Sequence, residues 1–252
     1  MQKLIGLVRR CVEDYHMIEA GDKIGIGVSG GKDSVALLVF LAELRKYNHK
    51  PFTLEAVSID LGFGMDFTPM ENLCASLDVP LTIVKTEISQ VIFDYRKEKN
   101  PCSMCAKMRR GALNQALLDR GLNKLALGHH YDDAVETFMM SLLYEGRISC
   151  FQPVTNLDRT GIIQIRPMLY LHERTIDNFV SRNELPVIKN RCPVDKRTKR
   201  EEIKRLVFNL SEQYPDLKDK IFGAMQRYPL PEWAPSGRYK PPKDLEDVST
   251  EV

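Results

Sequence analysis

Short apolar runs alternate along this chain with longer stretches in which apolar residues recur at helical spacing. The short runs predict strands at 23–28, 53–59, 81–85, 124–128 and 162–166. The longer stretches predict helices over 1–18, 33–47, 68–77, 105–120, 132–144, 173–183 and 196–210. Because the strands are separated by helical patterns, we predict an α/β fold: an open, mainly parallel sheet with helices on both faces.

The pattern changes after residue 210. Residues 1–210, with the N-terminal helix over 1–18, are expected to form one domain that contains the candidate sites. Residues 211–252 are expected to add a C-terminal helix and a tail that is rich in proline from Pro229 to Pro242 and acidic at its end. That tail has too little apolar content to order itself, so we expect it to be flexible.

Composition narrows the class of protein. With 43% hydrophobic residues in 252, the chain can build a packed core. No apolar run approaches the roughly 20 residues of a membrane-spanning helix, and the first residues lack a signal-peptide pattern, so we expect a cytoplasmic protein with no membrane contact. There, six cysteines more often bind metal, do redox chemistry or pack in the core than form disulfides. With a net charge of +2, nucleic-acid binding would rest on local basic patches.

The run Gly25-Ile-Gly-Val-Ser-Gly-Gly-Lys-Asp-Ser34 joins a predicted strand to a predicted helix. Such a turn directs backbone N–H groups and the positive end of the helix dipole at an anion. The P-loop motif is excluded, because it needs glycine in place of Ile26 and Ser or Thr in place of Asp33. Three glycines of the run match the dinucleotide-binding fingerprint, but the acid that would hold the ribose, Asp60, comes too late. An anion site of another kind is therefore predicted.

A second polar run, Leu127-Gly-His-His-Tyr-Asp-Asp-Ala-Val-Glu-Thr137, also follows a predicted strand. Gly128 permits the close approach of a ligand. Three carboxylates of the run can hold Mg²⁺ through oxygen: Asp132, Asp133 and Glu136. The first two also suit the cap and first turn of the following helix. The two histidines can equally be satisfied polar residues, and neither is assigned as a base.

Three cysteines form a possible ligand set. Cys102-Ser-Met-Cys105 lies in a predicted loop before a helix that carries Arg109 and Arg110, and Cys192 follows much later. A thioredoxin-like redox pair, a structural zinc site completed by His129 or His130, and an iron–sulfur cluster with one open iron all remain possible from spacing alone. The other cysteines are expected to be small buried hydrophobes: Cys11, Cys74 and Cys150.

The stretch Ser29–Ser34 resembles the pyrophosphate loop, S-G-G-x-D-S, of the ATP-pyrophosphatase (PP-loop) superfamily, whose fold is adenine nucleotide α-hydrolase-like. Those enzymes cleave ATP between its α and β phosphates and adenylate a carbonyl oxygen. The resemblance implies an ATP-binding set of Val28, Ser29, Gly30, Gly31, Lys32, Asp33, Ser34, Ile59, Gly128 and Asp133.

Three segments together resemble the TtcA-type tRNA 2-thiocytidine synthetases. They are Asp14-Tyr-His-Met-Ile-Glu-Ala-Gly-Asp-Lys23 running into the pyrophosphate loop, Cys102-Ser-Met-Cys105 with Arg109-Arg110-Gly111, and Gly128-His-His-Tyr-Asp-Asp133. The resemblance covers roughly residues 1 to 210. It implies a [4Fe–4S] cluster on Cys102, Cys105 and Cys192.

The resemblance implies ATP-dependent thiolation of tRNA, with a cytidine of the anticodon loop as the expected target. Asp33, Asp133 and Arg109 are the expected catalytic residues, the two aspartates with Mg²⁺. Basic side chains are expected to guide the RNA: Arg109, Arg110, Lys196, Arg197, Lys199 and Arg200. A cysteine desulfurase or free sulfide is the expected sulfur donor, and a homodimer is suggested.

Other interpretations compete with these. The basic stripe from Lys196 to Arg205 is alternatively a solvated helix with internal ion pairs. The chain is alternatively a tRNA lysidine synthetase-like or other adenylating ligase with a zinc site, or a nucleotide-binding regulator without chemistry. The cysteines distinguish tRNA thiolation from an adenylating ligase, because a ligase with an amine nucleophile needs no cluster.

Overall fold

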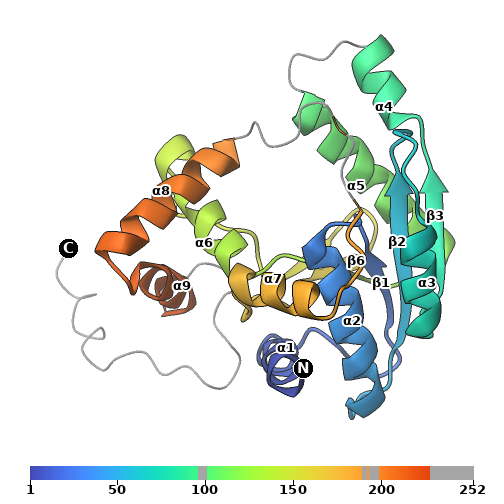
Figure 1. Ribbon diagram of the computed structural model, residues 1–252, viewed down its shortest axis with the longest axis horizontal. Coiled ribbons are helices and arrows are strands. Elements are labelled where there is room, and N and C mark those ends of the chain that lie inside the picture. Colours follow the sequence, from blue (N-terminus) through green and yellow to red (C-terminus); the bar gives the residue numbers. More distant parts are fainter. Residues whose placement is uncertain (96–100, 189–191, 193–198, 228–252) are drawn as a thin grey trace.

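The structure of the chain, a computed structural model, describes residues 1–95, 101–188, 192 and 199–227. It contains a six-stranded sheet in the order β3-β2-β1-β4-β6-β5 (Figure 1). The strands are β1 Lys23–Gly27, β2 Thr53–Asp60, β3 Leu81–Lys85, β4 Lys124–Ala126, β5 Val154–Leu157 and β6 Ile162–Ile165. Neighbouring strands are parallel except β5, which is antiparallel to β6. The predicted α/β fold with a mainly parallel sheet is confirmed.

Helices connect most of the strands. They are α1 Gln2–Asp14, α2 Lys32–Tyr47, α3 Thr68–Ser76, α4 Ile88–Gln90, α5 Pro101–Asp119, α6 Tyr131–Met140, α7 Glu173–Arg182, α8 Lys199–Gln213 and α9 Leu217–Arg227. Single turns of π-helix, η1 Val91–Tyr95 and η2 Ser141–Glu145, continue α4 and α6.

The sheet separates two apolar cores. On one face, Ile24 and Ile26 of β1 are fully buried in the larger core, which contains residues of α1, α2, α6 and α7. On the other face, α5 packs closely because β1 has glycine there. A Cβ at Gly25 would lie 3.1 Å from Leu122 Cδ1 and 3.2 Å from Leu117 Cγ. The glycines of β1 that match a dinucleotide fingerprint are thus explained in part by helix packing.

Several segments differ from the sequence prediction, among them the following. The helix predicted from residue 105 begins at Pro101, so Cys102 and Cys105 lie in the first turns of α5 and not in a loop. Proline fits the first turn of a helix, because no N–H is required there. The edge strand β5 was not predicted, since it has only two apolar residues. The N-terminal helix ends at Asp14, four residues before the predicted end at 18.

The C-terminal helices α8 and α9 pack against α6 and against each other (Figure 1). Helix α8 runs across residue 210, and the division of the chain at that residue stays a prediction. The proline-rich and acidic tail lies outside the described residues. Among the helices that the structure describes, none has the length and apolar character needed to cross a membrane.

Candidate functional site

The loop Ser29–Ser34 follows β1 and includes the first turn of α2, and its own serines brace it. Ser34 Oγ accepts a hydrogen bond from the Ser29 N–H at 3.1 Å and donates one to the Gly31 carbonyl at 2.8 Å. Gly30 has φ +82°, in the left-handed region that favours glycine. Gly31 is the N-cap of α2 and has no side chain to occupy the first N–H groups of that helix. The loop and helix therefore form an anion site made of backbone.

The chain segment before Cys192 docks on this loop. The Ile188 N–H donates to the Gly30 carbonyl at 2.9 Å. A Cβ placed on Gly30 would lie 2.9 Å from Ile188 Cβ, closer than such atoms pack. A glycine at residue 30 thus permits both the conformation of the loop and its close contact with the segment before Cys192.

Gly128 brings the end of β4 against the same loop. A Cβ at this residue would lie 3.1 Å from the Asp33 carbonyl carbon and 3.2 Å from the Ser34 nitrogen. Its role in the structure is close packing of two backbone segments, which joins the two polar runs of the sequence into one site.

Two carboxylates meet beside the loop, with His130 between them. His130 Nε2 lies 3.8 Å from Asp33 Oδ1 and 3.4 Å from Asp133 Oδ2. Asp133 accepts from the His130 N–H at 3.0 Å, as part of a capping box, and from Arg200 Nη1 at 3.0 Å. Asp33 Oδ1 is buried and accepts no hydrogen bond from the described residues, and burial raises the pKa of Asp33. Of these two carboxylates, Asp33 is therefore the one with an oxygen available to a cation.

The other carboxylates of this region differ in their bonding. Asp132 is buried and accepts from Lys218 Nζ at 2.5 Å and from the Glu173 N–H at 2.7 Å, which ties α6 to α9 and α7. Both oxygens of Asp132 are therefore used in contacts between helices. Glu136 is buried one helical turn beyond Asp133, and burial, followed by the charge of Asp133, raises its pKa to about 7.

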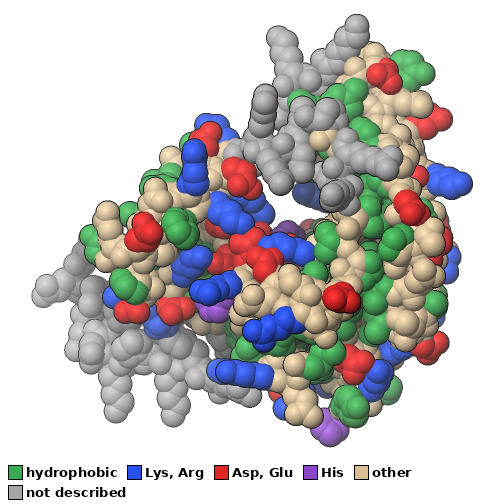
Figure 2. Space-filling view, viewed as in Figure 1, with side chains coloured by type: hydrophobic (Ala, Val, Ile, Leu, Met, Phe, Trp, Pro, Cys, Tyr) green, Lys and Arg blue, Asp and Glu red, His purple; other side chains and the backbone are tan. Residues whose placement is uncertain are grey.

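Lys32 points to α7. Its Nζ is paired with Glu173 Oε1 at 2.8 Å and with Asp177. Lys204 of α8 donates to the same oxygen of Glu173 at 2.7 Å. Burial alone would raise the pKa of Glu173, but the two lysines lower it to about 2. Acidic and basic side chains accordingly gather between α7 and α8 (Figure 2), and the charge of Lys32 is neutralised there.

The cysteines and the loop share one cleft of about 820 Å³. Cys102, Cys105 and Cys192 all line it, and so do Ser29 and Gly31 of the loop. The predicted ATP-binding residues Val28 and Ile59 also line it. Burial raises the pKa of Cys105, as do the thiols of Cys192 and Cys102, while Arg109 opposes the shift.

The three thiols have the donor chemistry of a metal site with one open coordination position. Among the described residues, no group of three or more His, Cys, Asp or Glu side chains is placed to hold a metal ion. Cys102 is exposed, and Cys105 and Cys192 are half-buried. The set fits a cluster in donor type and in its place on the cleft.

The predicted RNA-binding residues divide into three groups. Arg109 and Arg110 are exposed on α5 and line the cleft. Arg200 pairs with Asp133, and Lys199 Nζ lies 4.3 Å from the ring centroid of Tyr144. The remaining two, Lys196 and Arg197, lie outside the described residues.

Sequence reasoning missed one part of the cleft. Thr155, Gln164 and Arg166 line it from β5 and the end of β6, near His129. The signal that could have found them was the alternation of polar with apolar residues at Gln164 and Arg166, in a strand that is otherwise apolar.

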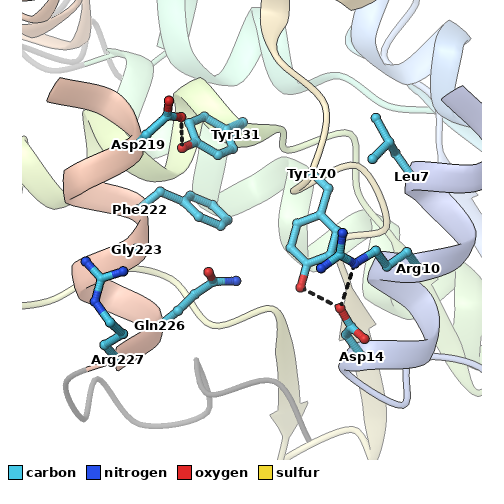
Figure 3. A pocket seen from close by; sticks show the side chains of 10 residues that line it. All are labelled: Leu7, Arg10, Asp14, Tyr131, Tyr170, Asp219, Phe222, Gly223, Gln226 and Arg227. Carbon is cyan, nitrogen blue, oxygen red and sulfur yellow. Dashed lines mark hydrogen bonds and ion pairs between the residues drawn. The ribbon is translucent and has the colours of Figure 1, made fainter. Parts of the chain in front are cut away.

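A second cavity of about 500 Å³ lies between α1 and α9 (Figure 3). Two pairs of its polar groups are hydrogen-bonded: the Tyr131 hydroxyl donates to Asp219 at 2.7 Å and the Tyr170 hydroxyl to Asp14 at 3.0 Å. The first bond joins the start of α6 to α9, and the second joins Tyr170 to α1.

The comparisons with known proteins agree with this geometry. A family model described as a PP-loop domain matches residues 7–211. A solved structure of the U34-tRNA thiolase NcsA from Methanococcus maripaludis with its [4Fe-4S] cluster superposes with a TM-score of 0.72, at 24% identity, over 87% of this chain and 75% of that chain. At this identity, the superposition on the thiolase shows a shared fold and no more. The fold and the glycine-rich loop define a PP-loop protein.

Curated relatives identify the family within that class. The tRNA-cytidine(32) 2-sulfurtransferase of Syntrophotalea carbinolica is 36% identical over 228 residues, which are 89% of this chain and 88% of the relative. The enzyme of the same name from Coxiella burnetii is 32% identical over 231 residues, 89% of each chain. This chain belongs to the tRNA-cytidine(32) 2-sulfurtransferase family, and the resemblance to TtcA-type synthetases is confirmed.

Proposed function

We propose that this chain uses ATP to convert a cytidine of tRNA into 2-thiocytidine. One observation carries the proposal: the glycine-rich loop and three cysteines line the same cleft. A reaction that activates a base with ATP and then replaces its oxygen with sulfur needs both sets of groups within reach of one base. The family name supports cytidine as the target.

The ATP half rests on the loop and on α2. Backbone N–H groups of Ser29–Ser34 would bind the phosphates. We propose that the carbonyl oxygen of the base attacks the α-phosphate, so that pyrophosphate leaves and the base oxygen carries AMP. Asp33, whose buried Oδ1 has no partner among the described residues, would bind Mg²⁺ together with Asp133 and thereby offset charge on the departing pyrophosphate.

Two contacts must change for the ATP half to work as proposed. Asp133 has to release Arg200 in order to bind Mg²⁺, and Lys32 has to leave Glu173 in order to reach a phosphate. Both partners lie on the α7–α8 side, so binding of ATP is expected to loosen that charge network.

The sulfur half rests on Cys102, Cys105 and Cys192, which would hold a [4Fe–4S] cluster. Three protein thiolates leave one iron of such a cluster without a protein ligand, and this open position would serve the sulfur chemistry. Sulfide from the donor would then replace AMP at C2 of the activated base. Arg109 and Arg110 flank two of these thiols and would contact the RNA backbone. A cysteine desulfurase or sulfide as donor, and a homodimer, stay parts of the proposal.

The experiment is nucleoside analysis of tRNA after incubation with anaerobically purified protein, ATP, Mg²⁺ and sulfide. We expect 2-thiocytidine only when ATP is present, and none with Cys192→Ala. Cys74→Ala is the matched control: this thiol is 1% exposed and lies outside the cleft, so its loss should leave the product intact. Product formed equally by Cys192→Ala would contradict the proposal.

A further inference from the structure

Polar side chains interrupt the apolar wall of the cleft beneath α5. Along β6, Ile162 belongs to the core that α5 covers, and Gln164 and Arg166 follow at intervals of two residues on the same face. Thr155 of β5 lies opposite Gln164 in register. The wall therefore changes from apolar to polar towards the carboxyl end of the sheet, where the candidate site lies.

Arg166 is a buried cation that, within the described residues, forms no ion pair with a carboxylate. It is 5% exposed. Its Nη1 donates to the Gln152 carbonyl and to Thr155 Oγ1 at 3.0 Å, while its buried Nε has no partner in the described part of the chain. Burial lowers the pKa of Arg166 to about 10, so the group remains charged at neutral pH. Buried charges and donors are costly unless an acceptor satisfies them.

His129 and the Arg166 guanidinium both contact the ring of Phe151. The His129 ring stacks on Phe151 with centroids 4.9 Å apart, and the Arg166 guanidinium lies 4.9 Å from the same ring. Burial, followed by the charge of Arg166, lowers the pKa of His129 to about 4, and its buried Nδ1 has no partner within the described chain. At neutral pH His129 therefore offers one donor and one acceptor.

We infer that Gln164, Arg166 and His129 recognise the hydrogen-bonding edge of the pyrimidine that is modified, an inference that rests on the proposed function. Gln164 Oε1 lies 3.5 Å from Arg166 Nη2, so its amide NH₂ group is left as a donor. Donors from Gln164 and Arg166 match the O2 and N3 acceptors of cytosine, and a neutral histidine matches its amino group. A phosphate would use the arginine but would leave no role for the neutral amide and imidazole.

The place of these residues agrees with the reaction. They line the same cleft as the loop and the thiols, so a base held by its edge would lie within the space where O2 meets ATP and C2 meets sulfur. Single-stranded RNA is commonly read in this way, by hydrogen bonds to the edge of a base that has been splayed out.

The test uses the full chain and two anticodon stem-loop RNAs that carry cytidine or an abasic residue at the target position. We expect wild-type protein to bind the cytidine RNA on the order of 10-fold or more tighter than the abasic RNA. Gln164→Leu, Arg166→Lys and His129→Phe should reduce that ratio to about two-fold or less, and ATP binding should stay unchanged. Arg159→Lys, at an exposed arginine in the β5–β6 turn, is the matched control and should keep the wild-type ratio.

Two results would overturn the inference. If all three variants keep the wild-type ratio of affinities for cytidine and abasic RNA, these residues do not recognise the base. An equal loss of affinity for cytidine and abasic RNA would assign them to the RNA backbone. Gln164→Leu retains Arg166, so a folding defect of the arginine variant leaves the test intact. Failure of the proposed function has another signature, the absence of 2-thiocytidine with wild-type protein on any tRNA.

Discussion

The two halves of the cleft are built differently. The phosphate half consists of backbone, and the loop is braced by Ser29, Gly31 and Ser34 before any ligand arrives. The thiol half consists of side chains, two on the first turns of α5 and one between segments that the structure leaves undescribed. Backbone geometry follows from the fold, whereas thiols are brought together by the group that they bind. We therefore expect the backbone of the phosphate loop to be preorganised, while Asp133 and Lys32 change partners when ATP binds. We expect the thiol half to be completed by its cofactor.

The largest effect should come from removing one thiol. Cys102→Ala should reduce thiolation more than about 100-fold, because loss of partners one shell further out already costs 10- to 100-fold at metal sites. Iron and acid-labile sulfide per chain, assayed on anaerobic protein, should fall with it, and so should the cluster absorption near 400 nm. Binding of ATP should persist, since no thiol belongs to the loop. Simultaneous loss of ATP binding would show that the halves are not separate.

Asp33→Asn should have the next largest effect. Loss of a carboxylate that binds Mg²⁺ should slow pyrophosphate release on the order of 100-fold. The same variant should melt at a higher temperature without nucleotide, because burial raises the pKa of Asp33 and the folded protein disfavours its charge at neutral pH. A lower melting temperature would mean that Asp33 stabilises the fold. The control is Asp60→Asn, at the end of β2. A substitution of Ser34 is not a suitable control, because Ser34 braces the loop.

Gly30→Ala should disturb both halves moderately. The new Cβ would meet Ile188, and a non-glycine residue at φ +82° adds about 1–2 kcal/mol of strain. We expect weaker ATP binding and a lower cluster content, measured by calorimetry and iron analysis. Gly31→Ala is the contrasting variant, because its Cβ would lie 3.5 Å from Ser29 Oγ, an ordinary contact. If both variants lower ATP binding and cluster content equally, the contact between Gly30 and Ile188 is not the cause.

The smallest effect concerns pH. The folded-state pKa of Glu136, about 7, lies above its ordinary value of 4.5. The resulting contribution to stability is complete below pH 4.5 and is lost as the pH rises through about 7. Glu136→Gln should remove this dependence and make the protein more stable than wild type above pH 7, by on the order of 2 kcal/mol. Denaturant unfolding at pH 5 and pH 8 measures the free energy of unfolding of both proteins. The same change of this free energy with pH in wild type and Glu136→Gln would contradict the raised pKa of Glu136.

The parts that could be predicted from sequence are those with local causes. The strand β1, the turn at Gly30 and Gly31 and the start of α2 follow from apolar runs and glycines within a dozen residues. The role of Gly128 as a packing contact with Asp33 required the structure, because the two lie on different strand ends. The same holds for the pairing of Lys32 with α7, since the motif alone indicates a phosphate ligand.

Other features escaped prediction because they depend on edges and helix starts. Strand β5 is short and lies at the edge of the sheet, where half its positions are polar, so no alternation was visible. The helix start at Pro101 was interpreted as a loop, and the structure instead places two cysteines on α5. Arg166 is buried through contacts with β5 and Phe151, neither of which its own sequence neighbourhood indicates.

The central claim is that one cleft activates the base with ATP and then adds sulfur, using separate sets of residues. The most direct test measures pyrophosphate and 2-thiocytidine in the same reaction for wild type, Asp33→Asn and Cys192→Ala. We expect Asp33→Asn to lose both products, and Cys192→Ala to release pyrophosphate while forming no 2-thiocytidine. If Cys192→Ala thiolates tRNA, or if Asp33→Asn thiolates it without releasing pyrophosphate, this account of the cleft is wrong.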